Sequence, residues 1–348
     1  MTRLGRVAGW GVACAVLLSA NGLAAAPRPA APAAGRGTWL REARFGVMTH
    51  YLADWIARRS GKEMTVEEWN RLVDGFDVEG LAEQLRAVGA GYHVLTLGQN
   101  SGYYLSPNAA YDGIVGARPS RCSRRDLVAD LQQALGKRGI RLVLYLPSGA
   151  PNRDPGAVAA LEWTNGPHRN REFQLKWERV IREWSLRYGR GIAGWWFDGC
   201  YWPNTMYRSP EPPSFESFAA AARAGNPYAA LAFNPGVVYR SLSVTPHEDY
   251  VAGEVDRLDR LSIRRAVDGK VDGAQVHVLS YLGQTWGTGE PRMTTGEAAA
   301  HSRKVAEAGG AITWDVPPRD DGRIPEAFRD VLVAVGRALP GRPAAPER

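Results

Sequence analysis

The chain has 348 residues, of which 45% are hydrophobic and 23% charged, values that are ordinary for a globular protein. The formal charge is +7, but the basicity is spread thinly because 43 Lys and Arg stand against 36 Asp and Glu. The one dense basic cluster, residues 118–125, has no interleaved aromatic residues, so we do not expect nucleic acid as a partner.

The first 26 residues have the pattern of an export signal. Arg3 and Arg6 form a positive start, and an apolar stretch with small residues near its end follows. This stretch is too short and too rich in glycine for a comfortable membrane span, so we expect no stable span after cleavage. Residues 27–40 are predicted to be a Pro/Ala linker and residues 341–348 a disordered tail. We therefore expect an exported protein, periplasmic or extracellular, with a single domain at 41–340.

Short apolar runs alternate with amphipathic segments along this domain. The predicted strands lie at 45–50, 92–98, 140–147, 191–199, 228–236, 249–254, 276–283 and 311–317. The predicted helices lie at 77–90, 124–139, 172–188, 214–225, 295–310 and 325–339. Strands that are apolar on both faces and separated by helices are typical of a parallel sheet buried under helices.

Eight such strands favour an α/β fold of the (β/α)8 TIM-like barrel type. A doubly wound open sheet is the alternative. It is less favoured because "THYLADW" stands after the first strand, where such folds carry a glycine-rich phosphate loop. Cys122 and Cys200 are the cysteines left after the leader, and the sequence is compatible with one disulfide or with two shielded thiols.

Polar and aromatic side chains gather at the strand ends where a barrel places its chemistry. Amides, carboxylates and a histidine suit sugar hydroxyls, and tryptophans suit the apolar faces of sugar rings. The predicted substrate-binding residues are His50, Gln99, Asn100, Trp196, Asn234, His277 and Trp286. His277 lies inside an apolar run, so a core histidine is the competing interpretation. The pattern predicts a carbohydrate as substrate, either an oligosaccharide or a glycoconjugate.

Glycoside hydrolysis needs two carboxyl groups on either side of the bond that breaks. Asp198, fixed at a strand end and followed by Gly199, is the predicted nucleophile, and Glu254 is the predicted acid/base. The competing interpretations are an aspartate that binds loop amides and a glutamate paired with a nearby arginine. Asp315 and Glu248 are the rival acids.

We expect neither a metal nor another cofactor. His50 has no second histidine in an H-x-H pair, and the sequence contains no CxxC or HExxH motif. A G-x-S-x-G motif is absent too, so a serine-hydrolase triad would lack its nucleophile elbow.

The order of these motifs resembles glycoside hydrolase family 29, the exported retaining α-L-fucosidases. "RFGVMTHYLADW" resembles the family's opening strand, whose histidine binds the sugar and corresponds to His50. "RYGRGIAGWWFDG" resembles the strand that carries the nucleophilic aspartate, which corresponds to Asp198. Residues 306–339 resemble the final barrel unit. The resemblance implies a retaining α-L-fucosidase-like hydrolase.

The chain departs from the family pattern in three places. Gln99 and Asn100 replace two adjacent sugar-binding histidines, and Val276 and His277 replace a Trp-Glu pair. The family's C-terminal β-sandwich is not expected, because the predicted elements stop after the eighth unit. Two alternatives therefore stay open: an impaired barrel that binds glycans, and a related exo-glycosidase for another sugar.

Overall fold

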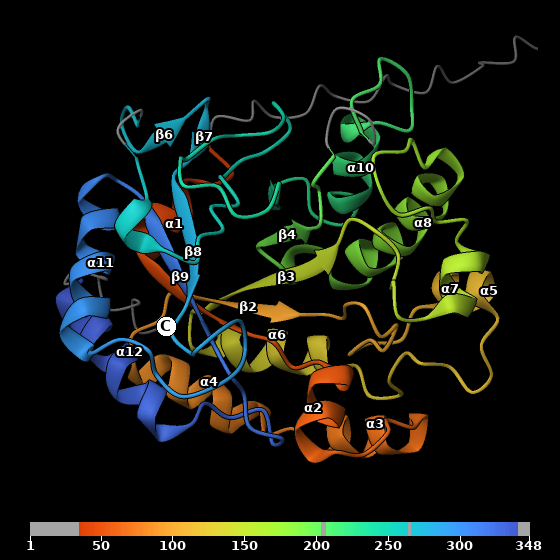
Figure 1. Ribbon diagram of the computed structural model, residues 1–348, viewed down its shortest axis with the longest axis horizontal. Helices are drawn as coiled ribbons and strands as arrows, with labels where there is room; N and C mark the ends of the chain where they lie inside the picture. The colour runs from red at the N-terminus through yellow and green to blue at the C-terminus, as the bar shows by residue number, and fades with distance from the viewer. Residues whose placement is uncertain (1–34, 203–206, 264–265, 340–348) are drawn as a thin grey trace, which may run out of the picture. The chain divides into compact units, whose positions relative to one another are not determined.

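A curled sheet of seven parallel strands forms the centre of the fold in this computed structural model, which describes residues 35–202, 207–263 and 266–339 (Figure 1). The strand order is β5-β4-β3-β2-β1-β9-β8. The first strand of the chain, β1, therefore pairs with the last, β9. The strands are β1 Phe45–Thr49, β2 Tyr92–Thr96, β3 Arg141–Pro147, β4 Gly194–Asp198, β5 Ala230–Phe233, β8 His277–Tyr281 and β9 Ala311–Val316. A hairpin of β6 Lys270–Val271 and β7 Ala274–Gln275 lies apart from this sheet.

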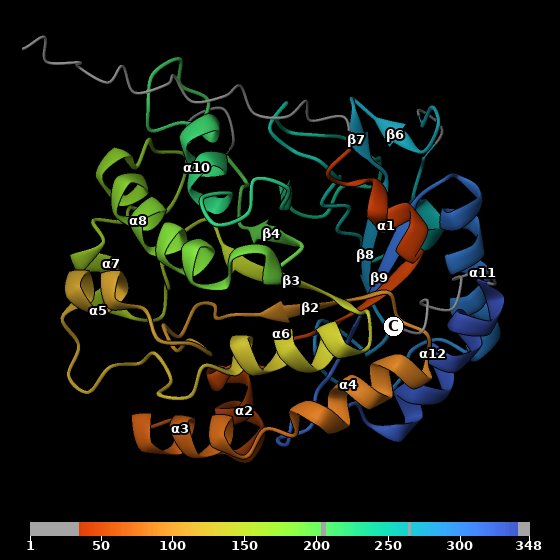
Figure 2. The ribbon, with the colours of Figure 1, turned by 180° about the vertical axis from the view of Figure 1, so that it is seen from behind.

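Helices cover the outer face of the sheet (Figures 1 and 2). The predicted helices appear as α4 Val78–Ala87, α6 Leu127–Lys137, α8 Arg171–Tyr188, α10 Phe215–Ala222, α11 Thr295–Glu307 and α12 Glu326–Ala338. The sequence analysis missed α1 Thr38–Ala43, α2 Ala53–Ser60, α3 Val66–Asp74, α5 Ala109–Val115 and α7 Pro155–Ala160, besides the 3-10 turns at 189–191 and 258–260. Most of these are too short for a clear helical period. Within the described ranges, no helix has the length and apolar character needed to cross a membrane.

The predicted leader, the linker up to residue 34 and the predicted tail lie outside the described residues. The end of the predicted linker is wrong, because residues 38–40 begin α1. Trp39 and Leu40 are buried there against the inner face of the curled sheet. Their burial packs residues 38–43 against the sheet.

Two apolar cores hold the sheet. The larger core lies between the sheet and the helices, and the smaller one fills the concave side with residues such as Met48, Tyr145 and Trp196. Strand side chains alternate between these two faces. On β4, Trp196 and Asp198 therefore point to the concave side, whereas Trp195 and Phe197 face the helices.

The sixth predicted strand, residues 249–254, does not form a regular strand. Gly253 adopts φ of +66°, and a Cβ at this position would lie 2.0 Å from the carbonyl oxygen of His277. Only glycine tolerates this left-handed conformation and this close approach. The backbone therefore turns at Gly253, and the segment forms one isolated bridge to β7, from Tyr250 to Gln275, and one to β8, from Glu254 to Leu279.

This irregular segment nevertheless fills the position between β5 and β8. On one side the amide of Asp249 donates to the carbonyl of Leu231 in β5 at 2.9 Å. On the other side the amide of Val255 donates to the carbonyl of Leu279 in β8 at 2.9 Å. Glu254 is thereby held beside β8 although it does not belong to the sheet.

Cys122 and Cys200 are both buried free thiols. Burial raises the pKa of each thiol because it disfavours the thiolate. Neither therefore has the character of a reactive cysteine. Of the two possibilities that the sequence left open, the structure shows the shielded thiols.

Candidate active site

Asp198 lies at the carboxyl end of β4, where three donors hold its carboxylate. Its Oδ1 accepts hydrogen bonds from the Gly199 amide at 2.7 Å and from Nδ2 of Asn234 at 2.8 Å. Its Oδ2 accepts a hydrogen bond from the hydroxyl of Tyr145 at 2.5 Å. These hydrogen bonds fix the direction of both oxygens. One of these three donors, the Gly199 amide, is a loop amide, and the other two are side chains.

Asn234 connects Asp198 to the second predicted carboxyl group. Its fully buried amide nitrogen also donates to Oε2 of Glu254 at 2.5 Å. The distance between Oδ1 of Asp198 and Oε2 of Glu254 therefore cannot exceed the summed lengths of these two hydrogen bonds. That limit is compatible with the ~5–5.5 Å between the carboxyl groups of retaining glycosidases.

Glu254 has a pKa well above the usual value for a glutamate. The pKa is raised to about 7, first because burial disfavours the charged form and then because Asp198 is negatively charged nearby. The hydrogen bond from Asn234 and the proximity of His50 oppose this shift. A carboxyl group that keeps its proton near neutral pH beside a carboxylate can act as a general acid.

The sequence analysis allowed an arginine partner for Glu254, but the two candidate arginines have other contacts. Arg257 pairs with Asp259 at 3.3 Å, and the guanidinium of Arg260 lies 5.6 Å from the centroid of the Tyr239 ring. A salt bridge would lower the pKa of Glu254, whereas this pKa is raised.

The rival carboxylates have structural roles of a different kind. Glu248 is buried behind β5, where its oxygens accept hydrogen bonds from the amides of Phe233 and Val244 at 2.6 and 2.7 Å. Burial raises the pKa of Glu248 to about 7 as well. Asp315 is the penultimate residue of β9, and its Oδ1 lies 2.8 Å from Nδ1 of His50.

Tyr145 is the main residue of this site that the sequence analysis missed. It lies on β3, its hydroxyl accepts a hydrogen bond from the side chain of Gln99, and the side chain of Asn100 donates to Gln99 at 3.4 Å. Burial and the charge of Asp198 raise the pKa of Tyr145 far above neutrality, so it remains a donor. Gln99 is therefore connected to Asp198 by two successive hydrogen bonds through the hydroxyl of Tyr145. The alternation of "IRLVLYLP" was the available signal, because it places Tyr145 on the inner face near the strand end.

His50 follows β1 and is held from two sides. Its Nδ1 is engaged by Asp315, while its ring stacks on Trp55 with 4.7 Å between the centroids. The edge of Trp286 approaches the same ring at 6.4 Å. Because Nδ1 is engaged, Nε2 is the nitrogen that can serve a ligand. Throughout 35–202, 207–263 and 266–339, no three His, Cys, Asp or Glu side chains are grouped so that they could hold a metal ion.

Two predicted substrate-binding residues are buried in the core instead. Trp196 points inward one layer below Asp198, is 3% exposed, and stacks on Tyr145 while its Nε1 donates to the carbonyl of Ala252. It forms the floor of the site. His277 begins β8, at the opposite end of the strand from the site, and is 2% exposed.

The prediction for His277 is therefore wrong, and the competing interpretation as a core histidine is correct. Its Nδ1 lies 3.0 Å from the carbonyl oxygen of Val251, and its Nε2 lies 2.7 Å from Oγ1 of Thr313. Burial lowers the pKa of His277 to about 4, so the ring is neutral near pH 7. Sequence periodicity located the strand but not which of its two ends meets the substrate.

Replacing His277 by alanine tests this assignment. We expect the free energy of unfolding in urea to fall by about 2–4 kcal/mol, because the substitution leaves a cavity and unpaired buried polar groups. We expect little change in KM. A variant of unchanged stability with a strongly raised KM would contradict the structural role.

The Asp198 carboxylate and the Glu254 carboxyl group of raised pKa share one amide donor, and such a pair of carboxyl groups is typical of glycoside hydrolases. The family model described as alpha-L-fucosidase matches residues 66–341. The chain belongs to the α-L-fucosidase family, which confirms the resemblance found in the sequence motifs. Comparison with curated proteins finds no match.

Solved structures of two kinds are similar to this chain. The endo-fucoidan hydrolase MfFcnA4 from glycoside hydrolase family 107 is 19% identical, with a TM-score of 0.67 over 86% of this chain and 53% of its own. The α-L-fucosidase AlfC from Lactobacillus casei, solved with α-L-fucose, is 16% identical, with a TM-score of 0.58 over 87% and 97%. A trapped covalent intermediate of an α-L-fucosidase from Bacteroides thetaiotaomicron is 17% identical, with a TM-score of 0.57 over 86% and 73%. These likenesses show the fold, and this chain spans about half the length of MfFcnA4.

Proposed function

We propose that the protein is a retaining glycoside hydrolase that cleaves α-L-fucosides. The observation that carries this proposal is the amide of Asn234, which binds both the Asp198 carboxylate and the Glu254 carboxyl group of raised pKa. The membership of the α-L-fucosidase family supports fucose as the sugar. The covalent intermediate trapped in the Bacteroides thetaiotaomicron relative supports a route through a glycosyl-enzyme.

In the first step, a carboxylate oxygen of Asp198 attacks the anomeric carbon. The bond from that carbon to the leaving oxygen breaks, and this oxygen takes the proton of Glu254. In the second step, the Glu254 carboxylate takes a proton from water, whose oxygen attacks the same carbon and displaces Asp198. Two displacements return the original anomeric configuration.

We infer that the strands close as a (β/α)8-type barrel around this site. The segment at 249–255 hydrogen-bonds to β5 on one side and to β8 on the other, as the sixth strand of a barrel would. Glu254 lies on this segment, so in such a barrel it would stand at the end of the sixth strand.

A panel of p-nitrophenyl glycosides tests the proposed function. We expect release of nitrophenol from the α-L-fucoside, with the β-anomer absent from the first sugar product seen by proton NMR. Turnover of an arabinoside or galactoside instead would assign the site to another sugar. Binding of fucose without any turnover would favour the glycan-binding alternative and overturn the enzyme.

We also propose that the protein is exported to the periplasm or the extracellular space. The charged start and apolar stretch of residues 1–26 support this, although they lie outside the described residues. Fractionation of cells that express the full chain tests it, since retention in the cytoplasm would contradict export.

Replacing Tyr145 by phenylalanine removes one donor to Asp198 and keeps the ring that stacks on Trp196 at 5.3 Å. We expect kcat/KM for the aryl α-L-fucoside to fall by roughly 10- to 100-fold, because a hydrogen bond to a charged group contributes about 1.5–3 kcal/mol. Steady-state kinetics measure this change, and a melting curve shows whether the fold is retained. Unchanged kcat/KM would show that Tyr145 does not support the carboxylate.

A further inference from the structure

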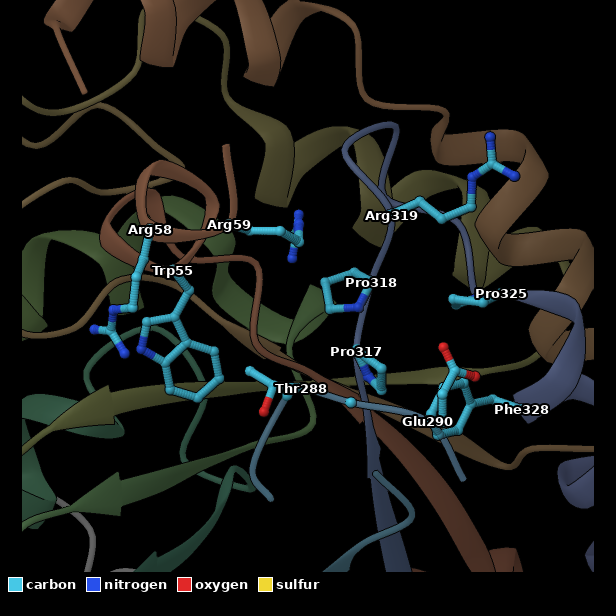
Figure 3. A pocket seen from close by; sticks show the side chains of 12 residues that line it. Trp55, Arg58, Arg59, Thr288, Glu290, Pro317, Pro318, Arg319, Pro325 and Phe328 are labelled. Atoms are coloured by element: carbon cyan, nitrogen blue, oxygen red, sulfur yellow. The ribbon is translucent and has the colours of Figure 1, made fainter. Parts of the chain in front are cut away.

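A cavity of about 520 Å³ opens near His50 (Figure 3). It lies between α2, the loop after β8 and the segment after β9, all of which follow the carboxyl ends of neighbouring strands. The charged and aromatic side chains that line it are Trp55, Arg58, Arg59, Glu290, Arg319 and Phe328.

Trp55 connects this cavity to the predicted catalytic pair. Its indole lines the cavity and also stacks on the ring of His50 at 4.7 Å. Gly287 packs against the indole of Trp55 and the Cβ of His50, since a Cβ at Gly287 would lie 2.2 Å from the indole and 2.8 Å from that Cβ. The cavity is therefore one indole away from the histidine predicted to bind the sugar.

The charges around the cavity favour an anion. Arg58, Arg59 and Arg319 line it, against the single carboxylate of Glu290. Figure 3 shows Arg59 reaching from α2 toward the segment after β9, while Arg58 and Arg319 lie at the rim. A planar guanidinium binds sulfate and carboxylate groups through two parallel hydrogen bonds.

Arg59 and Arg319 have acidic partners in exposed pairs, whereas Arg58 lies 4.0 Å from Asp54, whose side chain is 14% exposed. Arg59 binds Asp320 at 2.5 Å, with the two side chains 45% and 61% exposed. Arg319 binds Asp321 at 3.4 Å and is 63% exposed. Exposed pairs of this kind contribute little stability, so an anionic ligand in the cavity can take over the guanidinium groups.

We propose that this cavity is a second subsite, which binds a sugar residue bearing an anionic group, either a sulfate ester or a carboxylate. The residue belongs to the same chain whose fucose occupies the catalytic pair, so the proposal rests on the proposed function. Trp55, Phe328 and three prolines supply apolar surface for the sugar ring, and the arginines bind its anion. The substrate class is then an acidic fucose-containing oligosaccharide.

Matched substrates test this inference. Three fucose-terminated trisaccharides are compared by kcat/KM: one neutral, one sulfated and one with a uronic acid as the second or third residue. We expect a preference of about tenfold for at least one acidic substrate in 20 mM salt, and a smaller preference in 0.5 M salt because salt screens exposed charges. The acidic substrate that is preferred identifies the anion. Equal kcat/KM for all three would overturn the proposal.

Two variants with opposite expected effects sharpen the test. Arg59→Gln should lower the ratio of acidic to neutral kcat/KM to near one, whereas Asp320→Asn, which frees Arg59, should raise it severalfold. Arg86→Gln is the matched control, because Arg86 is an exposed arginine paired with Glu83 on α4 and does not line the cavity. A change in the ratio for Arg86→Gln equal to that for Arg59→Gln would also overturn the proposal.

Binding separates this proposal from the proposed function. Titration calorimetry of Asp198→Asn with the same trisaccharides measures affinity without requiring turnover. Tighter binding of an acidic trisaccharide that Arg59→Gln abolishes would support the subsite even if no fucosidase activity were found. Equal affinity of Asp198→Asn for all three trisaccharides, alongside fucosidase activity of the wild type, would overturn the subsite and leave the function standing.

Discussion

Asp198→Asn is expected to lower kcat/KM for an aryl α-L-fucoside by roughly 10⁴-fold or more, because an amide cannot form the glycosyl-enzyme. The substitution keeps the shape of the side chain, and its remaining oxygen can still accept from Gly199 and Asn234. We therefore expect the melting temperature to stay close to that of the wild type. Steady-state kinetics and a thermal melt on the same preparation measure both quantities.

Rescue by azide distinguishes a nucleophile from a structural aspartate. In Asp198→Ala, azide can attack the anomeric carbon directly while Glu254 protonates the leaving oxygen, which gives a glycosyl azide of inverted configuration. The same reagent with Glu254→Ala would give the retained configuration, because Asp198 still forms the covalent intermediate. An Asp198→Asn protein with near wild-type activity would refute the assignment.

Glu254→Gln is expected to lower kcat/KM by about 10²–10⁴-fold for fucosides with poor leaving groups, the range typical of general acid catalysis. A good leaving group needs little protonation, so the first step should be much less affected for dinitrophenyl fucoside. The wild-type activity should decline as the pH rises through about 7, where Glu254 loses its proton. This decline should be absent from the pH profile of the variant.

The matched control is Glu248→Gln, a second buried carboxyl group whose pKa is raised to about 7. Glu248 accepts hydrogen bonds from backbone amides behind β5 rather than from the bridging amide of Asn234. We therefore expect this variant to keep the basic limb of the pH–activity profile. Loss of that limb in Glu248→Gln, but not in Glu254→Gln, would transfer the role to Glu248.

The same raised pKa values set the direction of the pH dependence of stability. Each glutamate has a usual pKa of 4.5 and a folded value near 7, so the folded state binds more protons between these values. The free energy of unfolding should consequently fall as the pH rises through this window. Glutamine at either position removes that contribution, which denaturant unfolding at pH 5 and pH 8 can measure.

The ends of the strands were predictable from the sequence because they depend on local patterns. Apolar runs mark buried parallel strands, and polar residues begin where burial stops. These patterns alone placed Asp198, Asn234 and Glu254 at the ends of consecutive strands, and the fold has the first two at the ends of β4 and β5. The alternation of inner and outer positions along β3 was also sufficient to predict that Tyr145 faces the inner side near the strand end.

Contacts between distant segments could not be predicted from the sequence, because strand register and backbone turns are not local properties. The pairing of Pro147 with Asp198 brings Tyr145 to the carboxylate, and the left-handed Gly253 directs the segment that carries Glu254.

The sequence by itself therefore determined the α/β fold class and the family, and it predicted Asp198 and Glu254 as the catalytic pair. Only the tertiary structure decided that one buried amide joins those carboxylates, that His277 lies at the wrong end of its strand, and that Trp55 connects His50 to a basic cavity. The physical reason is burial: a pKa near 7 for Glu254 and the neutral ring of His277 arise from what surrounds each group, and those neighbours come from remote parts of the chain.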